Sequence, residues 1–238
     1  EFASDWDVKR LVKSIVLSRA YRRDATFSPA SRKADPTNRL LARGPRNRLD
    51  AEQLRDQALA LADLLNLTAG GPSSKPPQPS GIWESVGHSQ SNTVTFVPDQ
   101  GDAAVRRSVY TFWKRTSPPP SLAVFDAPTR ETCVTRRERT NTPAQALVTM
   151  NDPQFYRAAE ELAKLTLARE ADDDNKRMAW LFERVVGRVM TPRESEELGR
   201  LLRDLREHFA TLKVESVDKS AWTLVANTLL NLDEVLCK

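Results

Sequence analysis

The sequence of 238 residues has little glycine, only two cysteines and no long hydrophobic run, and each shortage excludes a class of protein. The eight glycines form neither a GxGxxG nor a GxxxxGKS/T motif, which excludes phosphate-cradling loops of those kinds. No apolar run approaches the roughly 20 residues that a membrane-spanning helix needs. Cys133 and Cys237 form no CxxC motif and imply no disulfide framework. We expect two independent free thiols, and a single disulfide between them stays open.

Histidine is equally scarce, because His88 and His208 are the only two in the chain. Neither belongs to an HxxxH, HExxH or Cys/His spacing, so the sequence nominates no metal site. We expect His208, which follows Glu207 in a helical stretch, to lie at the surface. No GxSxG motif occurs and neither cysteine has a histidine nearby in sequence, so no catalytic nucleophile is nominated. A pair of catalytic carboxylates stays open, because such residues need only meet in space.

Hydrophobic residues make up 39% of the chain and charged residues 29%, which is typical of a globular protein with its own core. The net charge of +4 is uneven, since residues 1–50 are basic and residues 151–238 are slightly acidic. A basic region can face an anionic partner, but a solvated surface opposite acidic groups is the interpretation we favour. Residues 106–115 mix basic and aromatic side chains, yet their alternation suggests that one face is core. We therefore do not expect nucleic acid as a partner.

Helical hydrophobic spacing predicts two helices near the N-terminus. The first runs from about Asp5 to Tyr21, with an apolar stripe at Trp6, Val8, Leu11, Val12, Ile15 and Val16. The second lies in residues 49–67, where Asp50 and Gln53 form a capping box, and we expect it to end at Gly70-Gly71-Pro72. A brief helix after Asp35-Pro36 would explain the apolar pair Leu40-Leu41.

The middle of the chain predicts extended structure. Residues 73–81 form a linker rich in proline and serine. Residues 93–97 and 108–114 are β-branched and aromatic, which is typical of short strands. The two segments could pair into a small hairpin or lie as extended chain over helices.

The C-terminal part is plainly helical, with helix starts at Thr142-Pro143, Asp152-Pro153 and Thr191-Pro192. Further apolar stripes begin at Met178 and Trp222. We therefore predict a mainly α fold, with a bundle of about four C-terminal helices, two N-terminal helices and a small extended or β-hairpin region in the middle. Its parts are residues 1–72, 73–130 and 131–238, expected to form one composite domain within a larger protein.

The stretch RRERTNTPAQAL, residues 136–147, is the best candidate for a binding site. Its arginines precede a helix whose first amides carry partial positive charge, and such a combination suits a carboxylate, sulfate or phosphate. The candidate anion-binding residues are Arg136, Arg137, Arg139, Asn141, Thr142 and Gln145. The alternative is structural: Thr142 caps the helix, and the arginines pair with Asp126, Glu131 and Glu138 to attach the loop to the bundle. No catalytic or metal-binding residue is nominated.

Several stretches together resemble a known family. They include SVYTFWKR, AWTLVANTLLNLDEVL and, most specifically, FDAPTRETCVTRRERTNTPAQALVTMNDP at residues 125–153. No general helix rule demands these residues at these spacings. The chain resembles the C-terminal part of the planctomycete cytochrome-associated domain family, also called domain of unknown function 1553.

The resemblance implies a large exported protein in which this domain follows a companion domain and a c-type cytochrome module. It therefore implies an extracytoplasmic or cell-envelope location, with a c-type haem in a neighbouring domain and no cofactor in this chain. The expected partners are other domains of the same polypeptide and a polysaccharide. We expect a non-catalytic helical module, and the alternative is the C-terminal part of a polysaccharide-acting hydrolase or redox enzyme that missing domains complete.

Overall fold

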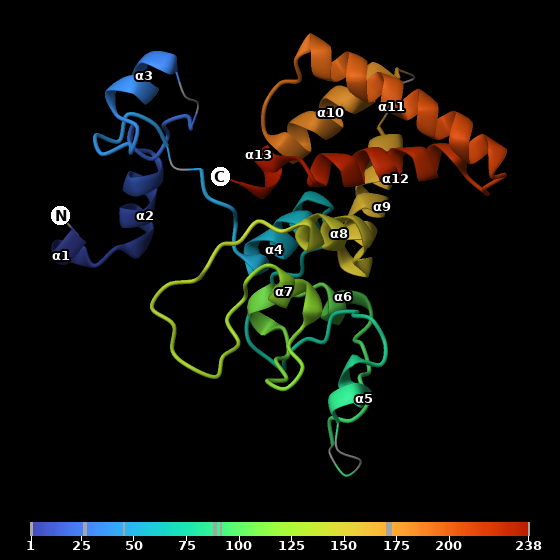
Figure 1. The fold of residues 1–238 in the computed structure, drawn as a ribbon, viewed down its shortest axis with the longest axis horizontal. Coiled ribbons are helices and arrows are strands. Elements are labelled where there is room, and N and C mark those ends of the chain that lie inside the picture. Colours follow the sequence, from blue (N-terminus) through green and yellow to red (C-terminus); the bar gives the residue numbers. More distant parts are fainter. Residues whose placement is uncertain are drawn as a thin grey trace. The chain divides into compact units, whose positions relative to one another are not determined.

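The structure, a computed structural model, describes residues 2–25, 28–44, 46–87, 90, 92–169 and 173–237 and is mainly helical (Figure 1). The chain divides into two compact units. Unit 1 comprises residues 1–48 with 237–238, and unit 2 comprises residues 49–236. The predicted division at residues 72 and 130 follows composition rather than compactness, and it stays a prediction.

The described residues of unit 1 form three short helices: α1 (Phe2–Asp5), α2 (Val8–Val16) and α3 (Pro29–Ala34). The predicted first helix is therefore present but shorter. Trp6 adopts a left-handed backbone with φ of 52°, which separates α1 from α2. The carboxylate of Asp7 then accepts the backbone N–H of Arg10 at 3.0 Å and starts α2.

The apolar stripe of α2 lies on one face of the helix, as predicted, but α2 has no buried residue. The exposed fractions of Val8, Val12 and Ile15 are 60%, 52% and 49%. In unit 1, Leu40 and Leu41 are exposed as well. None of the described apolar residues before Ala51 is buried.

The brief helix predicted after Asp35-Pro36 is wrong. The carboxylate of Asp35 accepts the backbone N–H groups of Arg39 at 3.0 Å and Leu40 at 2.8 Å, so it folds these residues into a turn. These two bonds stabilise the ionised carboxylate and lower the pKa of Asp35 below its ordinary value. The helix of this region is instead α3, which lies just before Asp35.

The first helix of unit 2, α4 (Ala51–Leu61), begins with the predicted capping box of Asp50 and Gln53. It ends earlier than predicted, well before Gly70. Asp63 takes the left-handed conformation that glycine usually supplies, with φ of 54°, and Leu64 donates its N–H to the carbonyl of Leu59 at 2.9 Å. Arg184 donates to the carbonyl of Leu61 at 2.6 Å and satisfies another group at the helix end.

The middle of unit 2 holds short helices joined by extended chain: α5 (Ile82–Val86), α6 (Gly101–Ala104), the 3-10 helix η1 (Ser108–Tyr110) and α7 (Pro120–Val124). Of the two alternatives, the extended one is realised, and the described residues contain only isolated bridges. Ser74 donates its N–H to Tyr110 and accepts that of Phe112, both at 2.7 Å. Residues 108–114 therefore pair with the proline-rich segment and not with residues 93–97.

The C-terminal helices of unit 2 form the predicted bundle (Figure 1). They are α8 (Pro143–Asn151), α9 (Pro153–Leu167), α10 (Asp174–Val186), α11 (Pro192–Thr211), α12 (Val217–Leu230) and the short α13 (Asp233–Leu236). The predicted starts of α8, α9 and α11 are confirmed, and each has proline in its first turn. α12 packs most extensively against α9 and then against α11.

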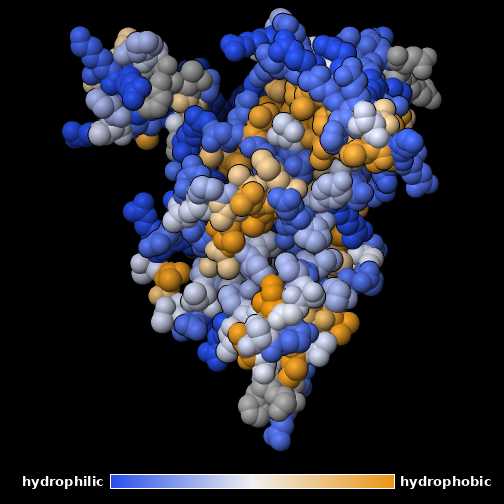
Figure 2. Space-filling model, turned by 45° about the vertical axis from the view of Figure 1, so that its right-hand side comes forward, coloured by the Kyte–Doolittle hydropathy of each residue, from blue (hydrophilic) through white to orange (hydrophobic). Residues whose placement is uncertain are grey.

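The core lies mainly between α9, α10 and α12. Its completely enclosed side chains, with no exposed surface, are Ala158, Ala159, Leu162, Ala163, Leu181, Ala221, Trp222, Val225, Ala226 and Leu229. Two large apolar residues of the C-terminal part lie outside it, since Val189 and Leu212 are 78% and 59% exposed. Gly187, with φ of 86°, ends α10, so Val189 lies beyond the helix and not on its buried face. Figure 2 shows one face of the molecule, where hydrophobic residues form separate patches among hydrophilic ones.

No helix among the described residues combines the length and the apolar composition that crossing a bilayer requires.

We predict that Leu162→Ala lowers the free energy of unfolding by about 2 to 5 kcal/mol, because it leaves a cavity in a fully enclosed part of the core. Chemical denaturation of the purified chain measures this change. Leu147→Ala is the matched control, since Leu147 on α8 is 61% exposed and its truncation should change stability by less than about 0.5 kcal/mol. Equal losses in the two variants would contradict the assigned core.

Candidate functional site

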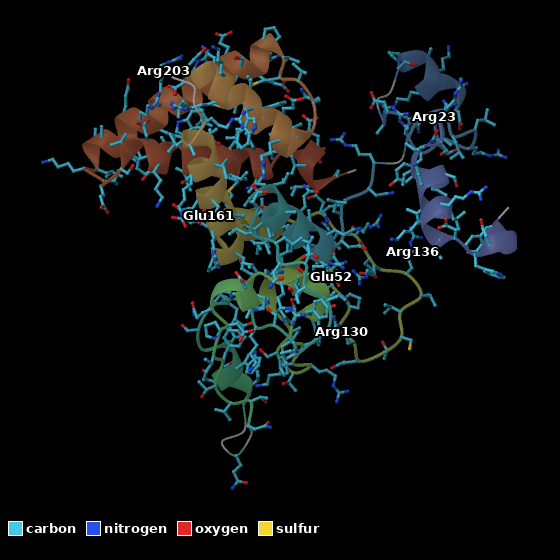
Figure 3. All side chains as sticks on the ribbon, turned by 180° about the vertical axis from the view of Figure 1, so that it is seen from behind. Arg23, Glu52, Arg130, Arg136, Glu161 and Arg203 are labelled. Carbon is cyan, nitrogen blue, oxygen red and sulfur yellow. The ribbon has the colours of Figure 1, made fainter. Side chains whose placement is uncertain are left out.

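The candidate anion-binding residues lie in the exposed loop between α7 and α8 and in the first turn of α8. Figure 3 labels Arg130 and Arg136 on this loop and Glu52 on α4. The whole segment 129–142 is exposed, and Gln145 is buried with 4% exposure. The loop is joined to the rest of unit 2 by two groups of polar contacts.

The first group joins the loop arginines to the start of α4. The guanidinium of Arg137 donates to both carboxylate oxygens of Glu52, at 2.6 and 3.1 Å, which is a bidentate arrangement. Its Nη1 also lies 3.6 Å from Asp50, and Arg139 reaches Asp50 at 3.5 Å. Of the three candidate arginines in the loop, Arg137 and Arg139 are therefore engaged by carboxylates.

These contacts shift the protonation equilibria of both partners. Partial burial of Glu52 favours its neutral form, but the hydrogen bonds from Arg137 and the backbone outweigh burial and lower the pKa of Glu52. The same bonds raise the pKa of Arg137 above its ordinary value. Both groups are therefore charged at neutral pH.

The second group joins the loop to α7 and to the start of α8. Thr140 donates its backbone N–H and its hydroxyl to Asp126, at 2.8 and 2.9 Å. Gln145 accepts the N–H of Thr142 at 3.2 Å in the predicted capping box, and it donates to the carbonyl of Val124 at 3.0 Å. Gln145 is therefore a buried structural residue that joins the start of α8 to the end of α7.

Of the carboxylates that the structural alternative named, Glu131 and Glu138 are not the partners of the arginines, and Asp126 attaches the loop through Thr140. The arginines reach Glu52 and Asp50, whereas Glu131 and Glu138 form no ion pair with any residue that the structure describes. Arg136 and Asn141 are exposed and likewise have no ion pair or side-chain hydrogen bond within the described part of the chain. The structure thus separates the six candidates into engaged and free side chains. Their role in anion binding stays a prediction.

Sequence reasoning missed a buried arginine, Arg55 on α4, whose residue is only 3% exposed. Its Nη1 donates to the carbonyl of Arg106 at 2.8 Å and to the hydroxyl of Ser108 at 3.0 Å, and its Nη2 donates to the carbonyl of Ala104 at 2.9 Å. Its Nε donates to Gln154. Burial lowers the pKa of Arg55 to about 10, so the group stays charged at neutral pH.

A signal for this residue was present in the sequence. Arg55 lies between Ala51 and Ala58 at helical spacing, on the face of α4 that enters the core. A charged side chain on such a face must find partners inside the protein.

A second buried arginine, Arg106, continues the pattern. Its guanidinium donates to the carbonyls of Thr68, Gly70 and Pro72 and stacks at 4.1 Å on the ring of Tyr110. The two arginines thus satisfy backbone carbonyls at and after the end of α6 and in residues 68–72.

His208 is exposed on α11, as predicted, and His88 lies outside the described residues. Neither Cys133 nor Cys237 forms a disulfide among the residues that the structure describes. Within the described ranges, no three His, Cys, Asp or Glu side chains gather into a group that could hold a metal ion.

Comparison with known proteins places the chain in a family without an assigned function. The family model of PSD1, described as a protein of unknown function (DUF1553), matches residues 1–202. This range includes the specific block at 125–153, and it stops before the C-terminal stretch 221–236 that also carried the resemblance. No curated protein and no solved structure matches the chain.

We predict that Arg137→Ala lowers the free energy of unfolding by up to about 1 kcal/mol at neutral pH, because the pair is partly exposed. Since the folded-state pKa of Glu52 is lowered, its contribution to stability is present above the ordinary value of 4.5 and is lost as pH falls through the folded value. Arg137→Ala should therefore lose less stability than the unaltered chain as the pH falls below the ordinary value of 4.5.

Arg136→Ala is the matched control, since Arg136 has no ion pair with a described residue. It should leave the acid unfolding curve unchanged. An acid unfolding curve of Arg137→Ala that follows the unaltered chain would show that the Glu52 pair contributes nothing.

Proposed function

The chain belongs to the DUF1553 family, and from this premise we propose that it is a non-catalytic helical module of a large exported, cytochrome-associated protein of the cell envelope. Unit 1 docks on another domain of the same polypeptide, and a c-type haem belongs to such a neighbouring domain. The loop at residues 136–145 offers a contact for an anionic group of a polysaccharide or of a partner domain.

The exposed apolar face of α2 is the observation that carries the docking proposal. Val8, Val12 and Ile15 recur at i, i+4 and i+7 and are all about half exposed or more. The opposite face carries Lys9, Arg10 and Lys13, which are exposed as well. A helix with one apolar and one charged face is stable where the apolar face is covered.

The rest of unit 1 favours a protein surface as the cover. Tyr21, Leu40 and Leu41 are between 62% and 83% exposed, so apolar groups outside α2 also lack a core within the described residues. A unit of about 50 residues without its own core needs another surface to be stable. A membrane surface would cover one helix face only, whereas a neighbouring domain can cover several segments.

The loop supports the anion contact through its free side chains. Arg136 keeps an exposed guanidinium, and Asn141 follows it at the start of the capping segment. Arg137 and Arg139 add positive charge nearby, although an anion that bound them directly would compete with Glu52 and Asp50. The contact therefore depends mainly on Arg136.

We predict that residues 8–17 exchange their amide hydrogens slowly in the complete gene product and quickly in the 238-residue chain alone. Packing against another domain suppresses the local opening that exchange requires. Hydrogen exchange followed by mass spectrometry of the two preparations measures this difference. The absorbance of c-type haem in the complete gene product tests the cytochrome association in the same sample.

Ile15→Asp in the complete gene product should restore fast exchange, because it places a charge on the docked face. Lys13→Asp is the matched control on the polar face and should leave exchange slow. Fast exchange of residues 8–17 in both unaltered preparations would refute docking. Protection that arises only after anionic vesicles are added would assign α2 to a membrane surface and refute the domain contact.

A further inference from the structure

An open groove of about 420 Å³ lies in unit 2 between α9 and the start of α12. α9 contributes Tyr156 and Glu160 to its lining, and α12 with the chain just before it contributes Glu215, Lys219 and Ser220. The volume falls within the range of about 300 to 1,000 Å³ that is typical of small-molecule sites. The groove therefore has room for a ligand the size of a sugar ring.

The two walls of the groove are held by the core behind them. α9 and α12 pack against each other more extensively than any other two described helices. Ala159 on α9 and Trp222 on α12 have no exposed surface. Thr223, which also lines the groove, is 2% exposed and donates its hydroxyl to the carbonyl of Lys219 at 2.7 Å. A groove with fixed walls loses little conformational freedom when a ligand binds.

The charged side chains of the groove have no partner within the described residues. Those of Glu160, Glu215 and Lys219 form neither an ion pair nor a hydrogen bond there. The neighbouring Glu161, by contrast, pairs with Lys164 at 2.5 Å and does not line the groove. The two carboxylates and the ammonium in the groove are therefore available to a ligand.

Hydroxyl groups complete the polar lining. Ser216 is the N-cap residue of α12, but its side chain makes no capping bond. The hydroxyls of Ser220 and Tyr156 likewise form no hydrogen bond with a residue that the structure describes. Carboxylates only accept hydrogen bonds, an ammonium only donates them, and hydroxyls do both. A ligand with several hydroxyl groups matches all three kinds of partner.

The lining disfavours a charged ligand and a wholly apolar one. An anion would face the carboxylates of Glu160 and Glu215, and a cation would face the ammonium of Lys219. Tyr156 is the aromatic residue among the described lining residues, and it is 40% exposed, so its ring can cover one apolar face of a ligand. The groove thus suits a neutral ring with an apolar face and hydroxyl groups at its edge.

We propose that this groove binds a neutral pyranose sugar, and specifically a β-linked glucosyl unit. The hydroxyl groups of β-glucose are equatorial, so they point outward from the edge of the ring and leave C–H bonds on both faces. One face lies on the ring of Tyr156, and the hydroxyl groups donate to Glu160 and Glu215 and accept from Lys219. The inference goes beyond the proposed function, because it uses neither α2 nor the arginine loop and involves no anionic group.

Titration of the purified chain with cellobiose, followed by amide NMR shifts, tests the proposal. We expect saturable shifts in residues 156–160 and 215–223. Tyr156→Ala should weaken binding about fivefold or more, because the sugar loses its stacking surface, whereas Tyr156→Phe should keep most of the affinity. Both variants should keep the thermal midpoint of the unaltered chain, since Tyr156 is exposed. Unchanged binding in Tyr156→Ala would overturn the proposal.

A pair of adjacent glutamates tests the polar contact. Glu160→Gln removes the charge that strengthens the hydrogen bond to a sugar hydroxyl and should weaken cellobiose binding about threefold or more. Glu161→Gln is the matched control, since Glu161, which Figure 3 labels on α9, pairs with Lys164 outside the groove. It should leave binding unchanged. Equal losses in the two variants would contradict the assigned contact, and so would full binding in Glu160→Gln.

Two charged sugars test whether the groove prefers a neutral ligand. Glucuronate carries a carboxylate and protonated glucosamine carries an ammonium, so both should bind more weakly than glucose. Tighter binding of glucosamine would make the groove a cation site, tighter binding of glucuronate would make it an anion site, and either result would refute the proposal. Absence of saturable cellobiose binding would also refute it and would leave the exchange result for α2 unaffected.

Discussion

Two buried arginines organise the middle of unit 2, and Arg55 is the more enclosed of them. The guanidinium of Arg55 cannot lie inside a protein without hydrogen-bond partners, because its desolvation is costly. The structure supplies these partners from α6, from η1 and from the start of α9, through Ala104, Ser108 and Gln154. Arg55 therefore holds α6 and η1, two short elements without sheet pairing of their own, against α4. The same requirement explains why Arg106 gathers the carbonyls of residues 68–72.

Arginines of the loop before α8 also hold chain segments together, in this case by ion pairs at the start of α4. Arg137 and Arg139 attach the exposed loop to Glu52 and Asp50, whose carboxylates lie at the positive end of the helix dipole. Arginine suits both places because its planar fork donates several bonds in fixed directions. The chain thus uses arginine first to organise backbone and loops. Among the candidate arginines of the loop, Arg136 lies outside these networks within the described residues.

Local chemistry made the helix starts predictable, and long-range chemistry did not. Thr142-Pro143, Asp152-Pro153 and Thr191-Pro192 each specify a start from neighbouring residues alone, and all three are confirmed. The partner of Arg137 could not be predicted, because Glu52 lies 85 residues away and several carboxylates lie closer in sequence. The exposure of α2 could not be predicted either, since periodicity identifies an apolar face and not what covers it.

The free energy of unfolding of Arg55→Met tests most directly whether buried arginine bonds organise unit 2. Methionine fills much of the same space but leaves the carbonyls of Ala104 and Arg106 without their donor. Each buried group left unsatisfied costs about 1 to 3 kcal/mol, so we predict a loss of at least about 2 kcal/mol. Hydrogen exchange in residues 101–112 should rise together with this loss. A change below about 0.5 kcal/mol, with exchange unaltered, would contradict the account.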